Sequence, residues 1–211
     1  MLKAERISVM NFENAIRGAR NPLNSWARMD SSYDAKGNFV FGENDLSLAR
    51  RLARAGSDHR KYLRQIFVSV DITAPLYWWK EFDTYKVGTV ANSTSTMHKI
   101  TAKAFDREDF SCDRMSDGAL ALLDSVIAFL EERRLTYLET KERQVWDDII
   151  QTLPSSYNQM RTVTMNYENL INIYYARKNH KLPEWHTLCD AILALPYAHD
   201  LICIKDDDNE D

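Results

Sequence analysis

The sequence predicts an α+β fold in which helices outnumber strands. Hydrophobic residues make up 45% of its 211 residues, enough to bury a sizeable core. Apolar side chains recur at helical spacing along most of the chain, and only short runs alternate as strands do. The six glycines and five prolines are too few for the many tight turns of an all-β sandwich. We expect a single domain over residues 1–204.

The charge and cysteine content indicate which partners the protein is expected to bind and in which compartment it is expected to lie. The net charge of −4 and the pI near 5.8 predict that the protein binds neither nucleic acid nor an anionic membrane surface. No run approaches the ~18 apolar residues of a membrane span. Three cysteines without metal-ligand spacing favour neither a disulfide framework nor a zinc site, which fits a cytoplasmic protein. Residues 205–211 form an acidic tail that we expect to be disordered.

The N-terminal quarter of the chain predicts a strand, a helix, a loop and a second helix. Residues 6–10 alternate as a short strand, and residues 11–20 place apolar side chains at helical spacing. Residues 21–38 are rich in Asn, Pro, Ser, Asp and Gly, which predicts a long loop. Asn44 is then expected to cap the N-terminus of a helix that ends at Gly56.

Basic side chains gather on the polar face of that second helix and in the turn after it. They are Arg50, Arg51, Arg54, Arg60, Lys61 and Arg64. One interpretation is an ordinary solvated face, and the other is a surface that faces the phosphates of a ligand. Both stay open, because sequence does not show where these side chains point.

Residues 66–72 form the clearest strand, because apolar and polar side chains alternate over the whole run. Pro75 ends this strand and suits the first turn of a helix. That helix carries Trp78, Trp79 and Phe82 on one face, and we expect most of these rings in the core.

Residues 89–98 are rich in hydroxyl groups, with five Ser or Thr side chains and one carboxamide. Such segments favour turns and caps, because their side chains compete for local backbone groups. The alternative is a hydrogen-bonding wall that contacts a pyrimidine edge, a ribose or a phosphate.

Most of the C-terminal half is predicted to be helical. A long amphipathic helix covers residues 117–138, and helical spacing continues over residues 139–153 until Pro154 breaks it. Two further helices are expected over residues 166–177 and 183–193. The sequence has no Walker, Rossmann or G-x-S-x-G pattern and no recognisable metal-binding histidine pattern.

Separated segments, taken together, resemble the flavin-dependent thymidylate synthases. Asn92 and Ser95 keep the N-x-x-S spacing of that family's signature. Leu153-Pro154 is followed by Asn166 twelve positions after the proline and by Arg177 eleven positions later, as in the family. The resemblance covers most of the chain. It implies a flavin-dependent thymidylate synthase-like fold, with a central antiparallel or mixed sheet and long flanking helices, and a homotetramer with sites shared between subunits.

The same resemblance implies roles for individual residues. Arg177 would be the catalytic residue that polarises the carbonyl groups of a pyrimidine, and Ser93 and Ser95 would also contact the nucleotide. The residues implied for the flavin side are Gln65, Lys86, Asn92, Asn166 and Asn172. The implied ligands are a pyrimidine deoxynucleotide such as dUMP, FAD as hydride carrier, and a reduced folate with NADPH for methyl transfer.

The sequence departs from the family where charged contacts are expected. The Arg-His-Arg signature becomes Thr84-Tyr85-Lys86, a glutamate that faces the substrate becomes Ser93, a histidine near the flavin becomes Gln65, and an arginine becomes Glu168. Each charge-assisted hydrogen bond contributes roughly 1.5 to 3 kcal/mol, so losing several would weaken binding by orders of magnitude. The basic residues that could replace these contacts are Arg17, Arg20, Arg60, Lys61, Arg64 and Arg161.

Three functional hypotheses follow. The first is a divergent thymidylate synthase-like protein that binds a dUMP-like nucleotide and FAD and transfers a methyl group from a folate. The alternative is a non-catalytic oligomer that binds or sequesters a nucleotide. The third is a structural oligomer with Trp78, Trp79 and Tyr85 at a subunit interface. For Arg177, the alternative to a ligand contact is an ion pair with Glu168, Glu184 or another acid.

Overall fold

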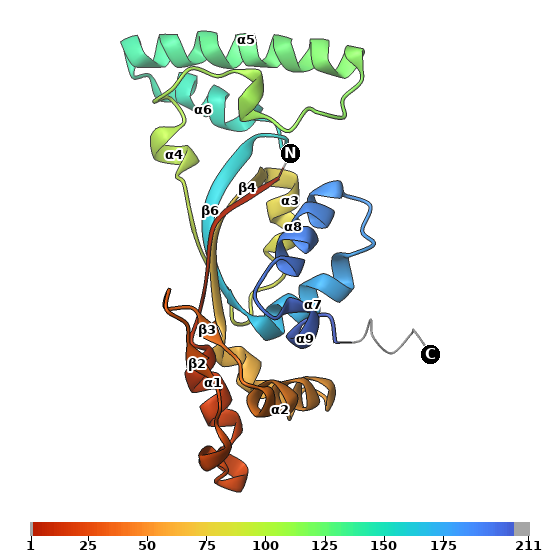
Figure 1. The fold of residues 1–211 in the computed structure, drawn as a ribbon. Coiled ribbons are helices and arrows are strands. Elements are labelled where there is room, and N and C mark those ends of the chain that lie inside the picture. Colours follow the sequence, from red (N-terminus) through yellow and green to blue (C-terminus); the bar gives the residue numbers. More distant parts are fainter. Residues whose placement is uncertain (1, 205–211) are drawn as a thin grey trace. The chain divides into compact units, whose positions relative to one another are not determined.

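The structure is a computed structural model that describes residues 2–204 (Figure 1). Its helices are α1 (Phe12–Ala19), α2 (Glu43–Arg54), α3 (Leu76–Phe82), α4 (Thr96–Lys99), α5 (Asp117–Thr140), α6 (Arg143–Thr152), α7 (Tyr167–Arg177), α8 (Pro183–Leu193) and α9 (Ala198–Leu201). Its strands are β1 (Lys3–Met10), β2 (Ser32–Tyr33), β3 (Phe39–Val40), β4 (Phe67–Pro75), β5 (Val90–Ser93) and β6 (Asn158–Asn166). The predicted acidic tail, residues 205–211, lies outside the described residues.

The main sheet has four strands in the order β1-β4-β6-β5, and β2 and β3 form a separate two-stranded sheet. The central strands β4 and β6 are antiparallel. The amide of Tyr167 donates to the carbonyl of Ile66 at one end of this pair, and the amide of Leu76 donates to the carbonyl of Tyr157 at the other. These elements confirm the predicted α+β class with an antiparallel central sheet.

Contacts within the described chain define two compact units. Unit 1 contains residues 2–3, 71–84 and 92–162, and unit 2 contains residues 4–70, 85–91 and 163–204. Both β4 and β6 continue from one unit into the other, so each unit holds part of that strand pair. The single domain expected over residues 1–204 stays a prediction.

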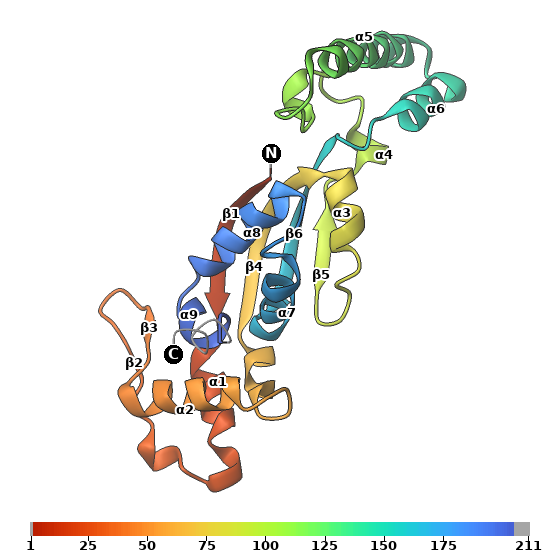
Figure 2. The ribbon, with the colours of Figure 1, turned by 90° about the vertical axis from the view of Figure 1, so that its right-hand side faces the viewer.

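In unit 1, α5 and α6 lie side by side over a hydrophobic core (Figures 1 and 2). The core residues are Ile100, Phe105, Phe110, Leu123, Leu130 and Ile149. α5 ends where Lys141 adopts a left-handed backbone conformation with φ of 56°, a common way for a helix to stop. The two successive helices predicted before Pro154 are therefore confirmed.

The tryptophans of α3 belong to the interior of unit 1. Trp78 and Trp79 are 0% and 1% exposed, and the rings of Trp78 and Phe82 stack with centroids 5.1 Å apart. The prediction that these aromatic rings are core is confirmed. The hypothesis that both tryptophans form a subunit interface is wrong, because side chains buried within one subunit cannot contact another.

The core of unit 2 is an aromatic cluster drawn from distant parts of the chain. The ring of Phe12 lies 5.6 Å from the rings of Phe39 and Tyr167. The ring of Tyr197 lies 4.8 Å from that of Phe41, whose backbone amide donates to the Tyr197 hydroxyl at 3.0 Å. Aromatic pairs at such separations stabilise a core beyond their buried area.

Strand β6 was not expected from the sequence. Two of its side chains are threonines whose hydroxyl groups bond to polar side chains of β4: Thr162 donates to Asp71 at 2.6 Å, and Thr164 donates to Ser69 at 3.3 Å. The apolar alternation that marks β4 is therefore weak in β6. The hydroxyl groups of these two threonines are satisfied by a partner strand that is distant in sequence.

The loop expected over residues 21–38 also contains a hairpin turn. The carboxylate of Asp34 accepts hydrogen bonds from the amides of Lys36 and Asn38, both at 2.8 Å, and from the Asn38 side chain. These bonds, led by that of the Asn38 side chain, hold the pKa of Asp34 below its usual value. Gly37, with φ of 80°, completes the turn that joins β2 to β3.

The N-terminus of α2 is capped by a residue from another segment. The N-cap position is Gly42, so the prediction of Asn44 as N-cap is wrong. The carboxylate of Asp30 accepts hydrogen bonds from the amides of Asn44, at 2.8 Å, and of Asp45, at 3.0 Å. A Cβ atom at position 42 would overlap the carbonyl oxygen and the carboxylate of Asp30. Glycine is therefore needed at position 42 for close approach.

We expect Gly42→Ala to lower the free energy of unfolding by about 2 to 4 kcal/mol, because the methyl group would displace the capping residue Asp30. Gly118→Ala is the matched control: position 118 lies in the first turn of α5 with open space around it, and alanine there should stabilise the helix by up to about 1 kcal/mol. Urea unfolding at neutral pH measures both effects. Equal stabilities of the two variants would contradict the close contact.

Candidate functional site

The predicted catalytic residue, Arg177, ends α7 and is half-buried in unit 2. Its Nε donates a hydrogen bond of 2.8 Å to the hydroxyl of Tyr85. Its guanidinium carbon lies 4.5 Å from the ring centre of Trp185 and 5.5 Å from that of Tyr85. Aromatic faces attract a planar cation at such distances, so both rings and the hydrogen bond to Tyr85 help to hold the guanidinium in place.

Two segments bring these rings to Arg177. Trp185 lies in the first turn of α8, which begins at Pro183, and its side chain is 0% exposed. Tyr85 lies in the loop after α3, and its carbonyl accepts a hydrogen bond from the hydroxyl of Thr89. This bond closes the loop into a turn and positions the Tyr85 ring.

The same loop is attached to the N-terminus of α7. The side-chain nitrogen of Asn169 donates to the carbonyl of Val87 at 2.7 Å. Gly88 has φ of +75°, and a Cβ there would lie 3.0 Å from the side-chain nitrogen of Asn166. Positive φ and close approach both require glycine at position 88. The loop that carries Tyr85 is therefore positioned by α7 itself.

Asn166, predicted for the flavin side, is the N-cap residue of α7. Its side-chain oxygen accepts from the amide of Asn169 at 3.0 Å, and its own amide donates to the Asn169 side chain at 3.1 Å, a reciprocal capping arrangement. The 11 residues of α7 span about 16 Å, so Asn166 and Arg177 of one chain cannot contact the same small ring. Asn172, also predicted for the flavin side, is exposed between them.

Gln65 and Lys86 are both exposed in unit 2. The Gln65 side chain lies against α1. It lines a cavity of about 620 Å³ together with His59, Lys61 and Arg64. The structure therefore places Gln65 beside ionisable groups, whereas Lys86 follows Tyr85 in the loop described above.

Three predicted site residues, Asn92, Ser93 and Ser95, belong to unit 1. Asn92 and Ser93 are exposed on β5. Ser95 is the N-cap residue of α4, and its hydroxyl accepts a hydrogen bond of 3.1 Å from the amide of His98. The turn-and-cap interpretation therefore applies to Ser95. Contacts of these three residues with a ligand stay predictions.

Glu168 is surrounded by basic side chains. It is 8% exposed and forms ion pairs with both Arg60 and Arg64. A buried carboxylate needs such compensation. The alternative in which Glu168 pairs with Arg177 is therefore wrong, and two of the six basic residues between positions 50 and 64 are neither simply solvated nor available to phosphate.

Two other candidate replacements are also paired with acids. Arg161 donates to Asp83 at 2.7 Å, and its guanidinium carbon lies 4.2 Å from the ring centre of Trp79. Arg20 is 4% exposed and donates through Nε to Asp45 at 2.7 Å. Each pair lies within its own unit and stabilises it.

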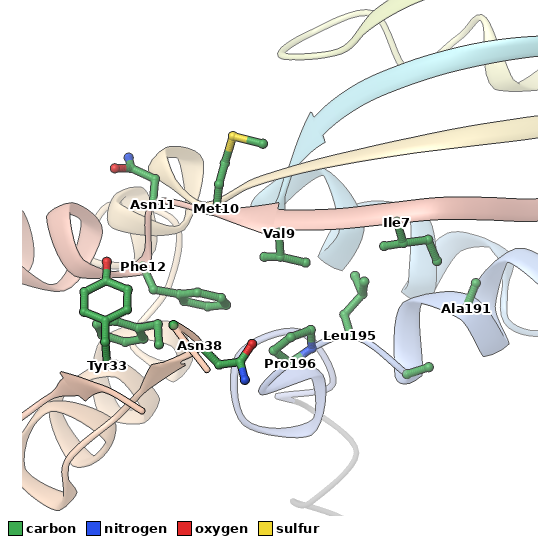
Figure 3. Close-up of a pocket in the computed structure, with 13 residues that line it drawn as sticks. Ile7, Val9, Met10, Asn11, Phe12, Tyr33, Asn38, Ala191, Leu195 and Pro196 are labelled. Atoms are coloured by element: carbon green, nitrogen blue, oxygen red, sulfur yellow. The ribbon is translucent and has the colours of Figure 1, made fainter. Parts of the chain in front are cut away.

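An apolar cavity of about 610 Å³ lies in unit 2 between β1, the β2–β3 hairpin and the segment after α8. Figure 3 shows Ile7 and Val9 pointing from β1 toward Leu195 and Pro196, whereas Met10 points the other way. None of the predicted site residues lines this cavity, and no charged side chain does. It therefore lacks the cation that a nucleotide phosphate requires.

Within residues 2–204, no three His, Cys, Asp or Glu side chains are grouped so that they could hold a metal ion. None of the helices described is both long and apolar enough to cross a membrane.

The three cysteines form no disulfide within residues 2–204 and differ in exposure. Cys189 and Cys203 are buried, and Cys112 is partly exposed. Burial raises the pKa of the Cys189 thiol to about 11, so only about one molecule in a thousand carries the thiolate at pH 8.

We therefore expect iodoacetamide at pH 8 to label Cys112 at least tenfold faster than Cys189. The thiolate is the reacting species, and burial also blocks access of the reagent. Mass spectrometry of digested samples taken over time measures both rates. The unfolded protein in urea is the control, in which all three cysteines should react at similar rates. Fast labelling of Cys189 in the folded protein would contradict its burial.

No family model and no curated protein matches the sequence. Solved structures match over nearly the whole chain. Thymidylate synthase X (ThyX) from Helicobacter pylori, crystallised with FAD and dUMP, has a TM-score of 0.70 at 18% sequence identity, over 97% of this chain and 100% of that chain. The chain has the ThyX fold.

Two further structures share the ThyX fold. A second Helicobacter pylori structure, of the flavin-dependent thymidylate synthase ThyX complexed with FAD and dUMP, has a TM-score of 0.66 at 17% identity, over 94% of this chain and 98% of that chain. The UMP/dUMP methylase PolB from Streptomyces cacaoi, bound with 5-Br dUMP, has a TM-score of 0.63 at 12% identity, over 98% and 95%. The predicted ThyX-like fold is confirmed, and function must be argued from the residues.

Proposed function

We propose that this ThyX-fold protein binds a pyrimidine nucleotide such as dUMP, with Arg177 as the contact to the base. The supporting observation is the guanidinium of Arg177, held by the rings of Tyr85 and Trp185. The three matching structures contain dUMP or 5-Br dUMP. Arg177 is also the residue to which the spacing in the sequence points.

A guanidinium suits this role because it is always protonated and its N–H groups lie in one plane. The carbonyl groups of a pyrimidine accept hydrogen bonds in the plane of the ring, and a cation beside them would stabilise negative charge that develops there. Because Tyr85 and Trp185 already hold the side chain, little conformational entropy is lost on binding. Ser93 and Ser95 are the other proposed nucleotide contacts.

The flavin contact implied at position 168 is not reproduced. The resemblance implies an arginine there, but Glu168 is an acid that already binds Arg60 and Arg64. Glu168 therefore cannot supply the guanidinium contact that the resemblance implies, and the two arginines beside it are already paired with its carboxylate. The residues present do not fit FAD at this position, and we assign no step to it. The flavin-side roles of Gln65, Lys86, Asn92, Asn166 and Asn172 stay predictions.

This charge reversal favours a second candidate function, a non-catalytic protein that binds or sequesters the nucleotide. Methyl transfer from a reduced folate with NADPH needs a hydride carrier such as FAD. An assay with dUMP, reduced folate, FAD and NADPH separates the two functions. Formation of a methylated nucleotide supports the enzyme, and bound nucleotide without product supports the binding protein.

Thermal unfolding of the purified protein tests dUMP binding. A ligand present at 100 times its Kd stabilises the folded state by about 2.7 kcal/mol, which raises the Tm of a protein of this size by about 5 to 10 °C. The visible absorption of freshly purified protein tests for FAD in the same sample. The proposal is wrong if neither dUMP nor another pyrimidine nucleotide shifts the Tm.

We also propose that the chain forms a homotetramer with sites shared between subunits. The exposed face of α5 carries apolar side chains, including Leu122 at 67% and Leu135 at 51% exposure, which a subunit interface would cover. Sedimentation equilibrium measures the assembly, and a mass equal to the 24.5 kDa monomer would contradict it. The cytoplasmic location and the absence of a nucleic-acid partner stay predictions from composition.

A further inference from the structure

A cavity of about 520 Å³ in unit 2 carries a concentration of arginine side chains. It lies between residues 19–28 and the N-terminal part of α2. Arg20, Arg28 and Arg51 line it, and no Asp or Glu is among the lining residues. None of the residues proposed above for nucleotide binding lines it either. Its volume falls within the range of about 300 to 1,000 Å³ that small-molecule sites occupy.

Arg20 forms the buried wall of this arginine-lined cavity. Its Nη2 lies 2.5 Å from Asp45 but has no partner with hydrogen-bond geometry. Its Nη1 reaches the carbonyl and the hydroxyl of Ser25 only at 3.4 and 3.5 Å. Buried N–H groups normally have well-placed acceptors. The Asp45 carboxylate therefore holds Arg20 in the wall of the cavity and neutralises its charge.

Arg28 and Arg51 are exposed and differ from other arginines of unit 2. Within residues 2–204, neither has a carboxylate partner. By contrast, Arg50, the neighbour of Arg51 on α2, pairs with Asp200 at 2.5 Å. Asp45 pairs with Arg20, and Asp30 caps α2 through the amides of Asn44 and Asp45, so neither of these acids forms an ion pair with Arg28 or Arg51.

We propose that the arginine-lined cavity binds the phosphate group of a small phosphorylated molecule. A phosphate monoester carries between one and two negative charges at pH 7, which the guanidinium groups of Arg28 and Arg51 match. Arginine binds phosphate oxygens through two parallel N–H bonds. The hydroxyls of Ser25 and Ser47 and the carboxamide of Asn44 supply further donors around the same cavity.

Titration calorimetry with inorganic phosphate, ribose 5-phosphate and ribose tests the site. We expect ribose 5-phosphate to bind, ribose not to bind, and the double variant Arg28→Gln, Arg51→Gln to weaken the binding by about a hundredfold or more, because two charge-assisted contacts are lost. Arg54→Gln is the matched control, since Arg54 is exposed on the same helix but does not line the cavity. Thermal unfolding confirms that the variants are folded.

The outcomes separate this site from the nucleotide contact at Arg177. Equal affinities for inorganic phosphate and ribose 5-phosphate would assign the cavity to the phosphate group alone, and tighter binding of the ester would assign it to a phosphorylated metabolite. Binding should persist in Arg177→Ala. The proposal is overturned if ribose 5-phosphate does not bind the wild-type protein, binds the double variant with unchanged affinity, or loses its affinity only in Arg177→Ala.

Discussion

Replacing Arg177 by alanine is expected to raise the Kd for dUMP by about a hundredfold or more. A guanidinium that contacts two carbonyl groups contributes two charge-assisted hydrogen bonds of roughly 1.5 kcal/mol or more each, and every 1.4 kcal/mol corresponds to a factor of ten. Titration calorimetry measures the Kd. Arg177→Lys keeps the charge but loses the planar fork, so its Kd should lie between those of the wild-type and alanine proteins.

Two further variants distinguish a direct contact from a general loss of positive charge. Tyr85→Phe removes the hydroxyl that accepts from Arg177 but keeps the ring, and we expect a smaller rise in Kd of about fivefold. Lys178→Gln removes the next charge along the chain, whose ammonium lies near the rings of Tyr174 and Tyr175, and should leave the Kd unchanged. If Arg177→Ala binds dUMP as the wild-type protein does, Arg177 is not the base contact.

Arg20→Ala is expected to lower the free energy of unfolding by about 3 to 5 kcal/mol, because it leaves the fully buried carboxylate of Asp45 without its cation. This is a large part of the 5 to 15 kcal/mol that stabilises a typical domain. Urea unfolding without ligand measures it. Arg50→Ala breaks a more exposed ion pair with Asp200 and should cost at most about 1 kcal/mol.

The effect of Arg20→Ala should depend on pH. Burial acts to raise the pKa of Asp45, but hydrogen bonds from Ser31 and Arg20 outweigh it and hold that pKa below its usual value. The stabilisation by the carboxylate is therefore complete above the unfolded pKa of about 3.9 and is lost as the pH falls through the lower folded value. The stability difference between wild-type and Arg20→Ala proteins should shrink at acid pH. A difference that does not change with pH would contradict the role of the ionised carboxylate.

Sequence patterns predict the elements whose periodicity is strong. Residues 66–72 alternate in sequence, and all but Ile66 lie on β4; residues 183–193 coincide with α8. β6 escapes prediction because Thr162 and Thr164 are satisfied by a strand about ninety positions away. The residue that caps α2 could not be predicted for the same reason, because Asp30 comes from another segment of the chain. Local patterns do not encode such long-range partners.

The candidate site, too, could be predicted only in part from the sequence. Arg177 could be singled out through the resemblance to the flavin-dependent thymidylate synthases, but its contacts with Tyr85 and Trp185 depend on how distant segments fold together. The sequence also does not show which arginines pair with an acid and which do not. Arg50, Arg51, Arg60 and Arg64 look alike in sequence, and only coordinates show that Arg51 alone among these four lacks an acid partner within residues 2–204.

The aromatic cluster of unit 2 also bears on the order in which the chain folds during synthesis. Its bond between Phe41 and Tyr197 joins residues 156 positions apart, so this unit cannot close until Tyr197 has left the ribosome. The α5–α6 core of unit 1 uses residues 100–149 and becomes available earlier. Nascent chains should therefore acquire protease resistance first around α5 and α6, and a truncation before Tyr197 should leave unit 2 dependent on chaperones.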